Sequence, residues 1–553
     1  MNGALPRCTI FQYLKECSRA YEAMTAINYF GRKITYGDLI HRIVATAESL
    51  SSYGIKENEI VTLLLTNTPE TIYVVYALNY IGAIPNFGYV TLSASEIVHE
   101  MHDNGSHTII LLDLFYKAMK SELADFHSII VSPKDSLPLM KRVLYNSKAE
   151  KIETGPNAIS FPNLLALRRN DSLQAAAYRS NAAALIVHSG GTTGTPKSVE
   201  LTDDNLNAIA WEYQHFGAQY AAGESFMHCI PPFHAFGFSV GVHMPLCLGL
   251  EVYASPKFDE KYVSESFYRI KPVHFFAGQS QVRAIISNAN GKKADLSNLK
   301  SFAAGGSSIS NDEEMKVNDF LKVHHSSSRL LMGYGMSELS ATVCAERNDA
   351  YKLGSVGIPL PKVNIKVIDT KDNHEMNVNE IGELCFESPT IMKGYLNNPE
   401  ETEMVVKTDI DGKRWVHSGD LGYVDEDGFV FISGRIKRIY VTRNSAGIPI
   451  KLFPDYVEKV IMSLPYVNDC AIICIKDQVK NYMPVAYIEL KPDADHEAAS
   501  LSISDFCNAK LPEYCVPVKF IFLEKMMFTA IGKKDYMTLQ KSYEDGLKVT
   551  LSK

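Results

Sequence analysis

Short apolar runs alternate with helical patterns along the first part of the chain. From Thr35 to Leu50 apolar residues recur at helical spacing, and the same periodicity returns from Glu70 to Tyr80. Two short apolar runs, Ile60–Leu65 and Thr108–Leu112, have the pattern of buried strands. This alternation predicts an α/β domain with a largely parallel sheet.

The alternation continues to about residue 332. Thr202–Phe216 has a helical pattern, with Thr202 as the expected N-cap and Asn205 three residues later. Strands that end in polar or glycine-containing loops bring those loops to one edge of a parallel sheet, so we expect several loops to converge on one cleft. The other segments of the alternation are Ala182–Val187, Phe226–Ile230, Glu251–Ala254, Phe267–Ile270, Val273–Ala277, Phe302–Ala304 and Leu330–Met332.

The pattern changes after about Gly354. Asn364–Ile368 and Glu383–Phe386 alternate with period two, and Asp425–Gly428 reads as a hairpin turn. We expect a β-rich unit at about 354–433 within an N-terminal domain of 1–435, followed by a small, mobile α+β domain of 436–553. The elements expected in the small domain are helix Asp455–Ser463, strands Asp469–Ile475 and Val485–Leu490, helix Ile503–Lys510 and strand Phe520–Leu523.

Composition excludes several classes of protein. The 553 residues suggest roughly three or four packing units, and 46% hydrophobic with 21% charged residues is ordinary for a globular chain. The net charge of −8 comes without a basic stripe, which argues against a nucleic-acid partner. The ten scattered cysteines indicate reduced thiols, and no apolar run is long enough to span a membrane. We therefore expect a cytoplasmic protein.

The segment from Ser189 to Lys197 reads Ser-Gly-Gly-Thr-Thr-Gly-Thr-Pro-Lys. Glycines let backbone amides approach an anion, while hydroxyls and an ammonium group add donors, as in a phosphate cradle. A Thr-Pro pair before Lys197 excludes the strict P-loop pattern. Alone, the segment fits an ordinary polar turn equally well. The candidate anion ligands are Ser189, Gly190, Gly191, Thr192, Thr193, Gly194 and Lys197.

Together with later motifs, this loop resembles that of the adenylate-forming enzymes, the superfamily of acyl-CoA synthetases, luciferases and peptide-synthetase adenylation domains. Tyr334-Gly335-Met336-Ser337-Glu338 is similar to a motif in which the tyrosine stacks on adenine, the hydroxyl touches the α-phosphate and the glutamate helps to hold Mg²⁺. Ser418-Gly419-Asp420 resembles the ribose-binding motif, and Arg435 the arginine that also contacts the ribose. A carboxylate oxygen is a ligand type that Mg²⁺ prefers.

The resemblance also assigns catalytic residues. Lys533, in Gly-Lys-Lys-Asp, resembles a catalytic lysine, and Lys437 resembles the hinge about which the small domain rotates. Arg438 stands where an acidic residue is usual, and Asn444–Phe453 is about five residues longer than usual. This altered loop affects the expected thioester step more than the expected adenylation.

The acid-binding residues are expected near Pro231–Phe238. His234 resembles a histidine beside the acyl channel, and we assign Phe236, Phe238 and Gly305 to the acid pocket. The adjoining Gly306 and Ser307 are assigned to the nucleotide. The segment lacks the aspartate that amino-acid-activating relatives use, which favours a fatty, aryl or similar acid.

The resemblance therefore implies an enzyme that uses ATP and Mg²⁺ to convert a carboxylic acid to an acyl adenylate, releasing pyrophosphate. Coenzyme A is the expected acceptor. A carrier-protein phosphopantetheine is the alternative acceptor, and a nucleotide-binding protein without catalysis is the alternative of another class.

Overall fold

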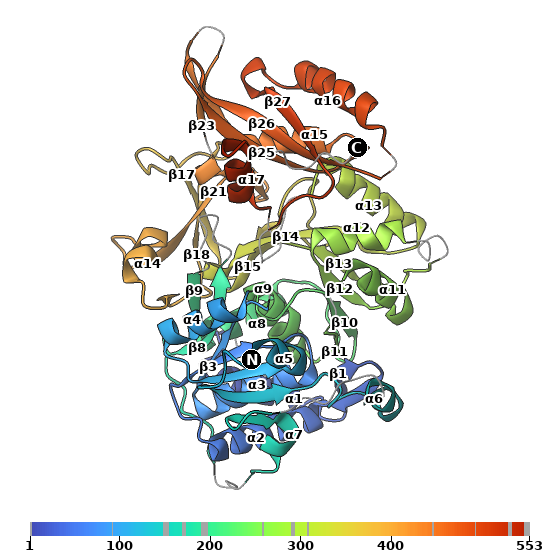
Figure 1. The fold of residues 1–553 in the computed structure, drawn as a ribbon, viewed down its shortest axis with the longest axis vertical. Coiled ribbons are helices and arrows are strands. Elements are labelled where there is room, and N and C mark those ends of the chain that lie inside the picture. The colour runs from blue at the N-terminus through green and yellow to red at the C-terminus, as the bar shows by residue number, and fades with distance from the viewer. Residues whose placement is uncertain are drawn as a thin grey trace.

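The fold was obtained as a computed structural model. It describes the following residues: 3–90, 92–146, 154–168, 173–189, 197–256, 259–288, 294–306, 309–438, 440–444, 447–492, 494–528 and 534–546. The chain forms a large N-terminal domain of two mixed sheets and a β-rich sheet, with a small α+β domain at its C-terminal end (Figure 1). The predicted α/β class with a small second domain is confirmed.

The first sheet has eight strands in the order β19-β9-β8-β4-β3-β5-β6-β7. The strands from β8 to β7 are parallel to their neighbours, whereas β9 is antiparallel to both β8 and β19. The predicted strands at 60–65, 108–112 and 182–187 are confirmed. Their bounds are β3 (Ile60–Leu64), β4 (Ile84–Phe87), β5 (Thr108–Leu112), β6 (His127–Val131), β7 (Ala158–Ser160), β8 (Ala183–Ser189), β9 (Lys197–Thr202) and β19 (Gly394–Tyr395).

The second sheet has nine strands in the order β16-β15-β14-β13-β12-β10-β11-β1-β2, parallel from β14 to β1 and antiparallel at both ends. The predicted segment 267–270 is the end of a helix, and 330–332 is only the first part of a longer strand. The strands are β1 (Thr25–Tyr29), β2 (Arg32–Thr35), β10 (Ser225–His228), β11 (Glu251–Ala254), β12 (His274–Ala277), β13 (Ser301–Ala304), β14 (Leu330–Met336), β15 (Ala341–Ala345) and β16 (Ile358–Pro359).

Helices cover these sheets and fill the space between them. Thr202 caps α8 in a capping box with Asn205, as predicted, and Thr35 caps α2. The helices of this part are α1 (Ile10–Ser18), α2 (Tyr36–Tyr53), α3 (Pro69–Ile81), α4 (Ala94–Asn104), α5 (Asp113–Met119), α6 (Leu139–Asn146), α7 (Phe161–Leu165), α8 (Asp203–His215), α9 (Ala235–Phe238), α10 (Met244–Cys247), α11 (Glu260–Ile270), α12 (Gln279–Ser287) and α13 (Asn311–Val323).

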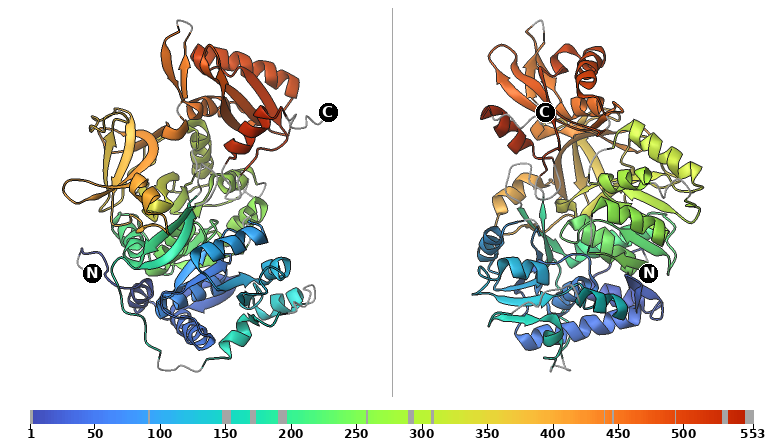
Figure 2. Two further views of the ribbon diagram at one scale, coloured as in Figure 1. Left: turned by 60° about the vertical axis from the view of Figure 1, so that its left-hand side comes forward. Right: turned by 45° about the vertical axis from the view of Figure 1, so that its right-hand side comes forward.

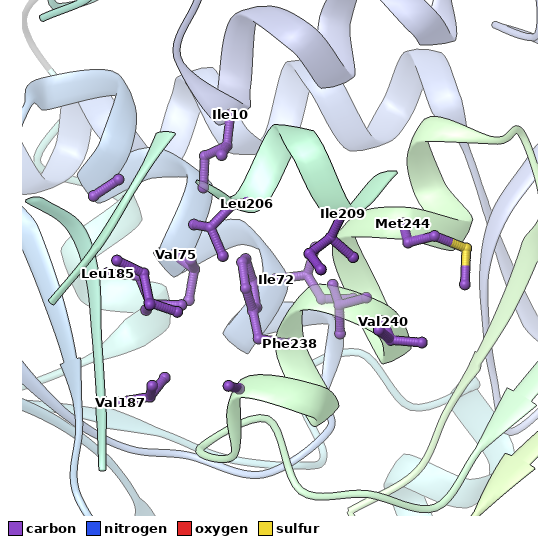
Figure 3. Close-up of a cluster of buried hydrophobic side chains, with 14 of the residues drawn as sticks. Ile10, Ile72, Val75, Leu185, Val187, Leu206, Ile209, Phe238, Val240 and Met244 are labelled. Carbon is purple, nitrogen blue, oxygen red and sulfur yellow. The ribbon is translucent and has the colours of Figure 1, made fainter. Parts of the chain in front are cut away.

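The main core lies where α3 and α8 meet strand β8 and the segment after β10. Helix α3 is buried along nearly its whole length, which explains why its sequence is apolar on all sides. Figure 3 shows side chains from these separate segments directed toward one another: Ile72, Val75, Leu185, Leu206, Ile209 and Phe238. Burial of this apolar surface fixes the two sheets against each other.

The β-rich unit is a five-stranded antiparallel sheet with the order β17-β18-β21-β20 and β22 beside β21. The predicted turn at Asp425–Gly428 joins β21 to β22. A single short helix, α14 (Pro399–Val405), precedes β20. The strands are β17 (Asn364–Ile368), β18 (Gly382–Glu387), β20 (Val406–Thr408), β21 (Arg414–Val424) and β22 (Val430–Arg435).

The C-terminal part packs helices on a three-stranded sheet, β25-β26-β27, with its own apolar core. In both views of Figure 2 it forms the upper end of the molecule, and the blue helices and strands of the N-terminal part lie in the lower half. The expected elements are all present, and the long run after Lys437 is a β-hairpin of β23 and β24 rather than an irregular loop. The elements are β23 (Tyr440–Arg443), β24 (Pro449–Leu452), α15 (Pro454–Met462), β25 (Val467–Asp477), β26 (Asn481–Leu490), α16 (His496–Lys510), β27 (Lys519–Leu523) and α17 (Tyr536–Glu544).

All ten cysteines are free thiols. Across the described ranges, no helix has both the length and the apolar composition that crossing a membrane requires.

Candidate active site

Tyr334, Asp420 and Arg435 meet at one point between the second sheet and the β-rich unit. The Tyr334 hydroxyl donates to Asp420 Oδ2 at 2.6 Å, and Arg435 Nε lies 2.9 Å from Asp420 Oδ1. Asp420 and Arg435 are also register partners on β21 and β22. The Asp420 side chain is 6% exposed, so its charge depends on these partners. The structure thus brings together three residues that are far apart in the sequence.

The Tyr334 ring is positioned by the local backbone. Strand β14 runs on to Met336 in a bulged pairing with β15, and a Cβ at Gly335 would lie only 1.5 Å from the Ala341 carbonyl oxygen. Glycine is therefore required for the two strands to approach here. The Tyr334 ring lies 5.6 Å from the ring of Phe386 on β18. Phe386 therefore packs beside the Tyr334 ring and restricts its position.

Glu338 lies on the 3-10 turn Ser337–Leu339, which packs against β8. Its carboxylate is buried, and Oε1 accepts a hydrogen bond of 2.7 Å from the hydroxyl of Tyr395. Burial, and then the Glu338 charge, raise the pKa of Tyr395, so this hydroxyl stays a donor. A buried carboxylate beside a hydroxyl group has oxygen ligands of the type that fits Mg²⁺.

The phosphate-loop segment connects β8 to β9. Ser189 is the last residue of β8 and Lys197 the first of β9, and the two are register partners. Gly190, Gly191, Thr192, Thr193 and Gly194 lie outside the described residues. Lys197 forms an ion pair with Glu401 and lies 5.0 Å above the Tyr395 ring. Tyr395 therefore contacts both Lys197 and Glu338.

The predicted acid segment follows β10. The His234 ring lies 5.8 Å from the ring of Tyr89, and Phe236 faces Gly305, where a Cβ would lie 3.6 Å from the phenyl ring. Phe238 has different surroundings, because it belongs to the main core and packs 6.2 Å from Tyr76. Of the two predicted phenylalanines, only Phe236 is therefore next to the glycine loop.

The glycine loop is only partly described. Gly306 has a φ of +87°, a conformation that favours glycine, and Ser307 lies outside the described residues.

Lys437 lies in the 3-10 turn Ile436–Arg438, between β22 and the small domain. Its neighbour Arg438 pairs with Asp455, and its Nη2 lies 2.7 Å from Glu458 Oε1. Arg438 thus pairs with two acids of α15. This pairing explains why a basic residue fits at a position where an acidic residue is usual.

Lys533 lies outside the described residues. The adjacent Lys534 Nζ lies 2.7 Å from Asp469 Oδ1 and 3.9 Å from Glu458 Oε2. The second lysine of the Gly-Lys-Lys-Asp motif is therefore part of the packing of the small domain.

Sequence reasoning missed several residues that contact the predicted site. Tyr395 and Phe386 reach it from β19 and β18, and neither stands at a fixed spacing from a motif. Tyr89 was missed too, although its hydroxyl donates at 2.8 Å to the carbonyl of His188, one residue before Ser189. These contacts form between strands that are far apart in the sequence, so no local sequence pattern predicts them.

Comparisons with known proteins identify the family of this chain. The family model for AMP-binding enzymes matches residues 14–396, and that for the AMP-binding enzyme C-terminal domain matches residues 456–533. A long-chain-fatty-acid–CoA ligase of Bacillus subtilis (strain 168) is 28% identical over 548 residues, covering 96% of this chain and 93% of the relative. The 4-coumarate–CoA ligase 4 of Arabidopsis thaliana is 25% identical over 512 residues, covering 91% and 85%.

Among solved structures, an anthranilate CoA ligase in complex with anthranoyl-AMP superimposes with a TM-score of 0.83 at 20% identity, covering 98% of this chain and 99% of the other. The o-succinylbenzoate CoA synthetase of Bacillus subtilis with ATP and magnesium ion gives a TM-score of 0.75 at 22% identity, covering 96% and 99%. At such low identities the solved structures establish the fold alone, and the match to the family model establishes the family. This protein belongs to the AMP-binding, adenylate-forming enzymes.

Proposed function

We propose that the protein joins a carboxylic acid to coenzyme A through an acyl adenylate, with ATP as the second substrate. The observation that carries this proposal is the meeting of Tyr334, Asp420 and Arg435, with Glu338 on the turn that follows β14. A phenol ring, a carboxylate that accepts two hydroxyls and a guanidinium group match adenosine and its ribose. The relatives from Bacillus and Arabidopsis are both named as CoA ligases, which supports the same acceptor.

The chemistry requires two anions to approach each other. An acid carboxylate attacks the α-phosphorus of ATP, pyrophosphate leaves, and like-charge repulsion opposes the approach in a site poor in water. Mg²⁺, when bound at Glu338, would neutralise phosphate charge. Lys197 and the segment 190–194 would hold the leaving pyrophosphate, and Lys533 would lie between carboxylate and α-phosphate. Catalysis then depends on positioning and electrostatics.

The apolar surroundings of Phe236 and the aromatic contacts of His234 favour an acid without an α-ammonium group, such as a fatty or aryl acid. No acidic residue lies within Pro231–Phe238 to pair with an ammonium group. The predicted substrate is therefore a class of acids, fatty or aryl, and not one particular acid. The cytoplasmic location also stays a prediction.

The domain boundary at 435/436 and the hinge at Lys437 remain part of the proposal. The backbone amide of Arg435 donates to Asp455 Oδ2 at 3.2 Å, so the two domains already touch beside the ribose site. Rotation about Lys437 would break this contact and bring the β23–β24 hairpin toward the acid. The second half-reaction, thiol attack on the adenylate carbonyl with release of AMP, would follow this rotation.

The deciding experiment measures acid-dependent ATP–pyrophosphate exchange across fatty and aryl acids, then acyl-CoA formation with coenzyme A and with a holo-carrier protein in parallel. We expect exchange with at least one apolar acid and transfer to coenzyme A. Lys533→Ala should abolish exchange at an unchanged melting temperature. Lys534→Ala should lower the melting temperature, because it removes the cation that pairs with Asp469.

Intact exchange in Lys533→Ala would overturn the assignment of the first step. Transfer to the carrier protein alone would support the second acceptor, and ATP binding without exchange for any acid would support a non-catalytic nucleotide-binding protein.

A further inference from the structure

Three side chains of types that can ligate a metal, from two neighbouring strands, meet on one face of the β-rich sheet. Glu383 and Cys385 stand two residues apart on β18, so they point to the same face. His417 on β21 is the register partner of Cys385. One carboxylate oxygen, the thiol sulfur and one ring nitrogen all lie within 4.8 Å of one another. None of the three belongs to the nucleotide site described above.

The three side chains differ in how they are held and in how solvent reaches them. Cys385 is fully buried, whereas the Glu383 and His417 side chains are each 13% exposed. Glu383 Oε2 lies 3.1 Å from His417 Nδ1, with one proton between them. A metal ion that replaced this proton would bind both groups without a large movement of either strand.

The donor types decide which ion fits. A thiolate, an imidazole and a carboxylate with one open position form a ligand set suited to Zn²⁺ and similar ions. Mg²⁺ and Ca²⁺ prefer oxygen ligands alone, so this set discriminates against them. We propose that Glu383, Cys385 and His417 form a binding site for one thiophilic divalent cation of the Zn²⁺ type, separate from the Mg²⁺ site proposed at Glu338.

A cation bound there would affect the nucleotide site. Glu383 Oε1 accepts a hydrogen bond of 3.0 Å from the backbone amide of Gly419, and the next residue is Asp420. Gly419 has a φ of +69°, so this turn is held in a conformation that favours glycine. Drawing Glu383 toward a metal weakens its bond to Gly419 and displaces Asp420. This consequence rests on the proposed function, whereas the metal site itself does not.

The charges nearby limit the affinity. Burial, and then the Glu383 charge, raise the pKa of the Cys385 thiol to about 12, so a cation must displace a tightly held proton to bind the sulfur. Lys366 and Lys407 favour the thiolate, but their positive charge also repels the cation. We therefore expect weaker binding than at structural zinc sites that have several thiolates.

The test titrates tag-free, reduced protein with Co²⁺ in excess Mg²⁺, and then measures bound Zn²⁺ by equilibrium dialysis. We expect one site per chain and an absorption band from charge transfer between thiolate and Co²⁺. Cys385→Ser should remove the band. Cys385→Ser and His417→Asn should each weaken Zn²⁺ binding at least tenfold. Cys474→Ser, a buried strand cysteine outside the cluster, is the matched control and should leave both unchanged.

Absence of the band in the wild-type protein, or equal Zn²⁺ affinity in Cys385→Ser and Cys474→Ser, would overturn the site. Loss of Zn²⁺ binding in His374→Ala would assign it to the exposed group Asp369, Asp372 and His374 instead and would also overturn the proposal. Should Cys385→Ser not fold, Glu383→Gln serves as the second variant, because it keeps the side-chain volume and removes the anionic ligand.

The coupling has its own readout. In the wild-type protein, Zn²⁺ should raise the apparent dissociation constant for ATP severalfold, and this effect should vanish in Cys385→Ser. Zn²⁺ bound at the site with no change in ATP binding would overturn the coupling and leave the proposed function untouched.

Discussion

The Tyr334 hydroxyl donates a 2.6 Å hydrogen bond to Asp420 Oδ2 across 86 residues of sequence. It joins the end of β14 in the second sheet to β21 of the β-rich unit. Burial of the phenol, and then the Asp420 charge, raise the pKa of Tyr334 well above its usual range, so the hydroxyl remains a donor at neutral pH. The contact holds the proposed adenine and ribose residues together in one geometry.

Asp420→Asn should weaken adenylate formation. The amide keeps the size of the side chain but loses the charge that holds Tyr334 and Arg435, and charge-assisted hydrogen bonds contribute about 1.5–3 kcal/mol. We expect kcat/KM for ATP in pyrophosphate exchange to fall about 10- to 100-fold. Asp411→Asn, in an exposed turn of the same unit, is the control. Equal kcat/KM in both variants would contradict the role of Asp420.

Glu338→Gln should raise the Mg²⁺ concentration needed for exchange and lower the maximal rate about 100-fold, as for loss of a charge-stabilising group. Tyr395→Phe removes only the hydroxyl that donates to Glu338. Tyr395→Phe should lower the free energy of unfolding by about 1 kcal/mol and leave the Mg²⁺ dependence of exchange nearly unchanged. Mg²⁺ titrations of both variants separate a metal ligand from a packing residue; an unchanged Mg²⁺ requirement in Glu338→Gln would speak against the ligand role.

Arg438→Met should destabilise the small domain. The guanidinium group pairs with Asp455 and Glu458 and lies 3.8 Å above the Tyr536 ring. Removing it takes the guanidinium from both acids, although Glu458 keeps its contact with Lys534, and breaking such a pair costs about 3 kcal/mol. Chemical denaturation should show a lower unfolding free energy. Arg443→Met, on the exposed hairpin, is the comparison and should change that free energy by less than about 0.5 kcal/mol.

Glu70→Gln should make stability less dependent on pH. Glu70 is buried at the start of α3, and burial raises the pKa of its carboxyl from 4.5 to about 7, although Ser136 donates to it. Between these two values the folded protein keeps a proton that the unfolded chain releases. The unfolding free energy therefore falls as the pH rises from about 5 to about 7, by about 3 kcal/mol for this group.

Glutamine has no proton to lose, so Glu70→Gln should match the wild-type protein at pH 5 and be more stable at pH 8. Urea denaturation at both pH values measures the difference. Glu426→Gln, at an exposed turn, should show no such pH-dependent gain. A constant difference between Glu70→Gln and wild type across pH 5 to 8 would contradict the raised pKa.

Local patterns in the sequence determined the class of fold and most strands. The runs at Ile60–Leu65 and Thr108–Leu112 are strands because each is apolar over a strand's length, and Thr202 with Asn205 starts α8 because the capping box is a local interaction. The resemblance through Tyr334–Glu338 and Asp420 gave the family, which the family model confirms. The roles of individual site residues stay predictions.

Only the tertiary structure decided which side chains meet. Tyr395 reaches Glu338, and Glu383 holds Gly419, across strands whose order the sequence does not encode locally. The run after Lys437 proved to be a hairpin, since its pairing depends on register rather than on a helical or apolar pattern. A periodic pattern records which face of an element is buried. What that face contacts depends on the packing of the whole chain, and the chemistry of the site is set there.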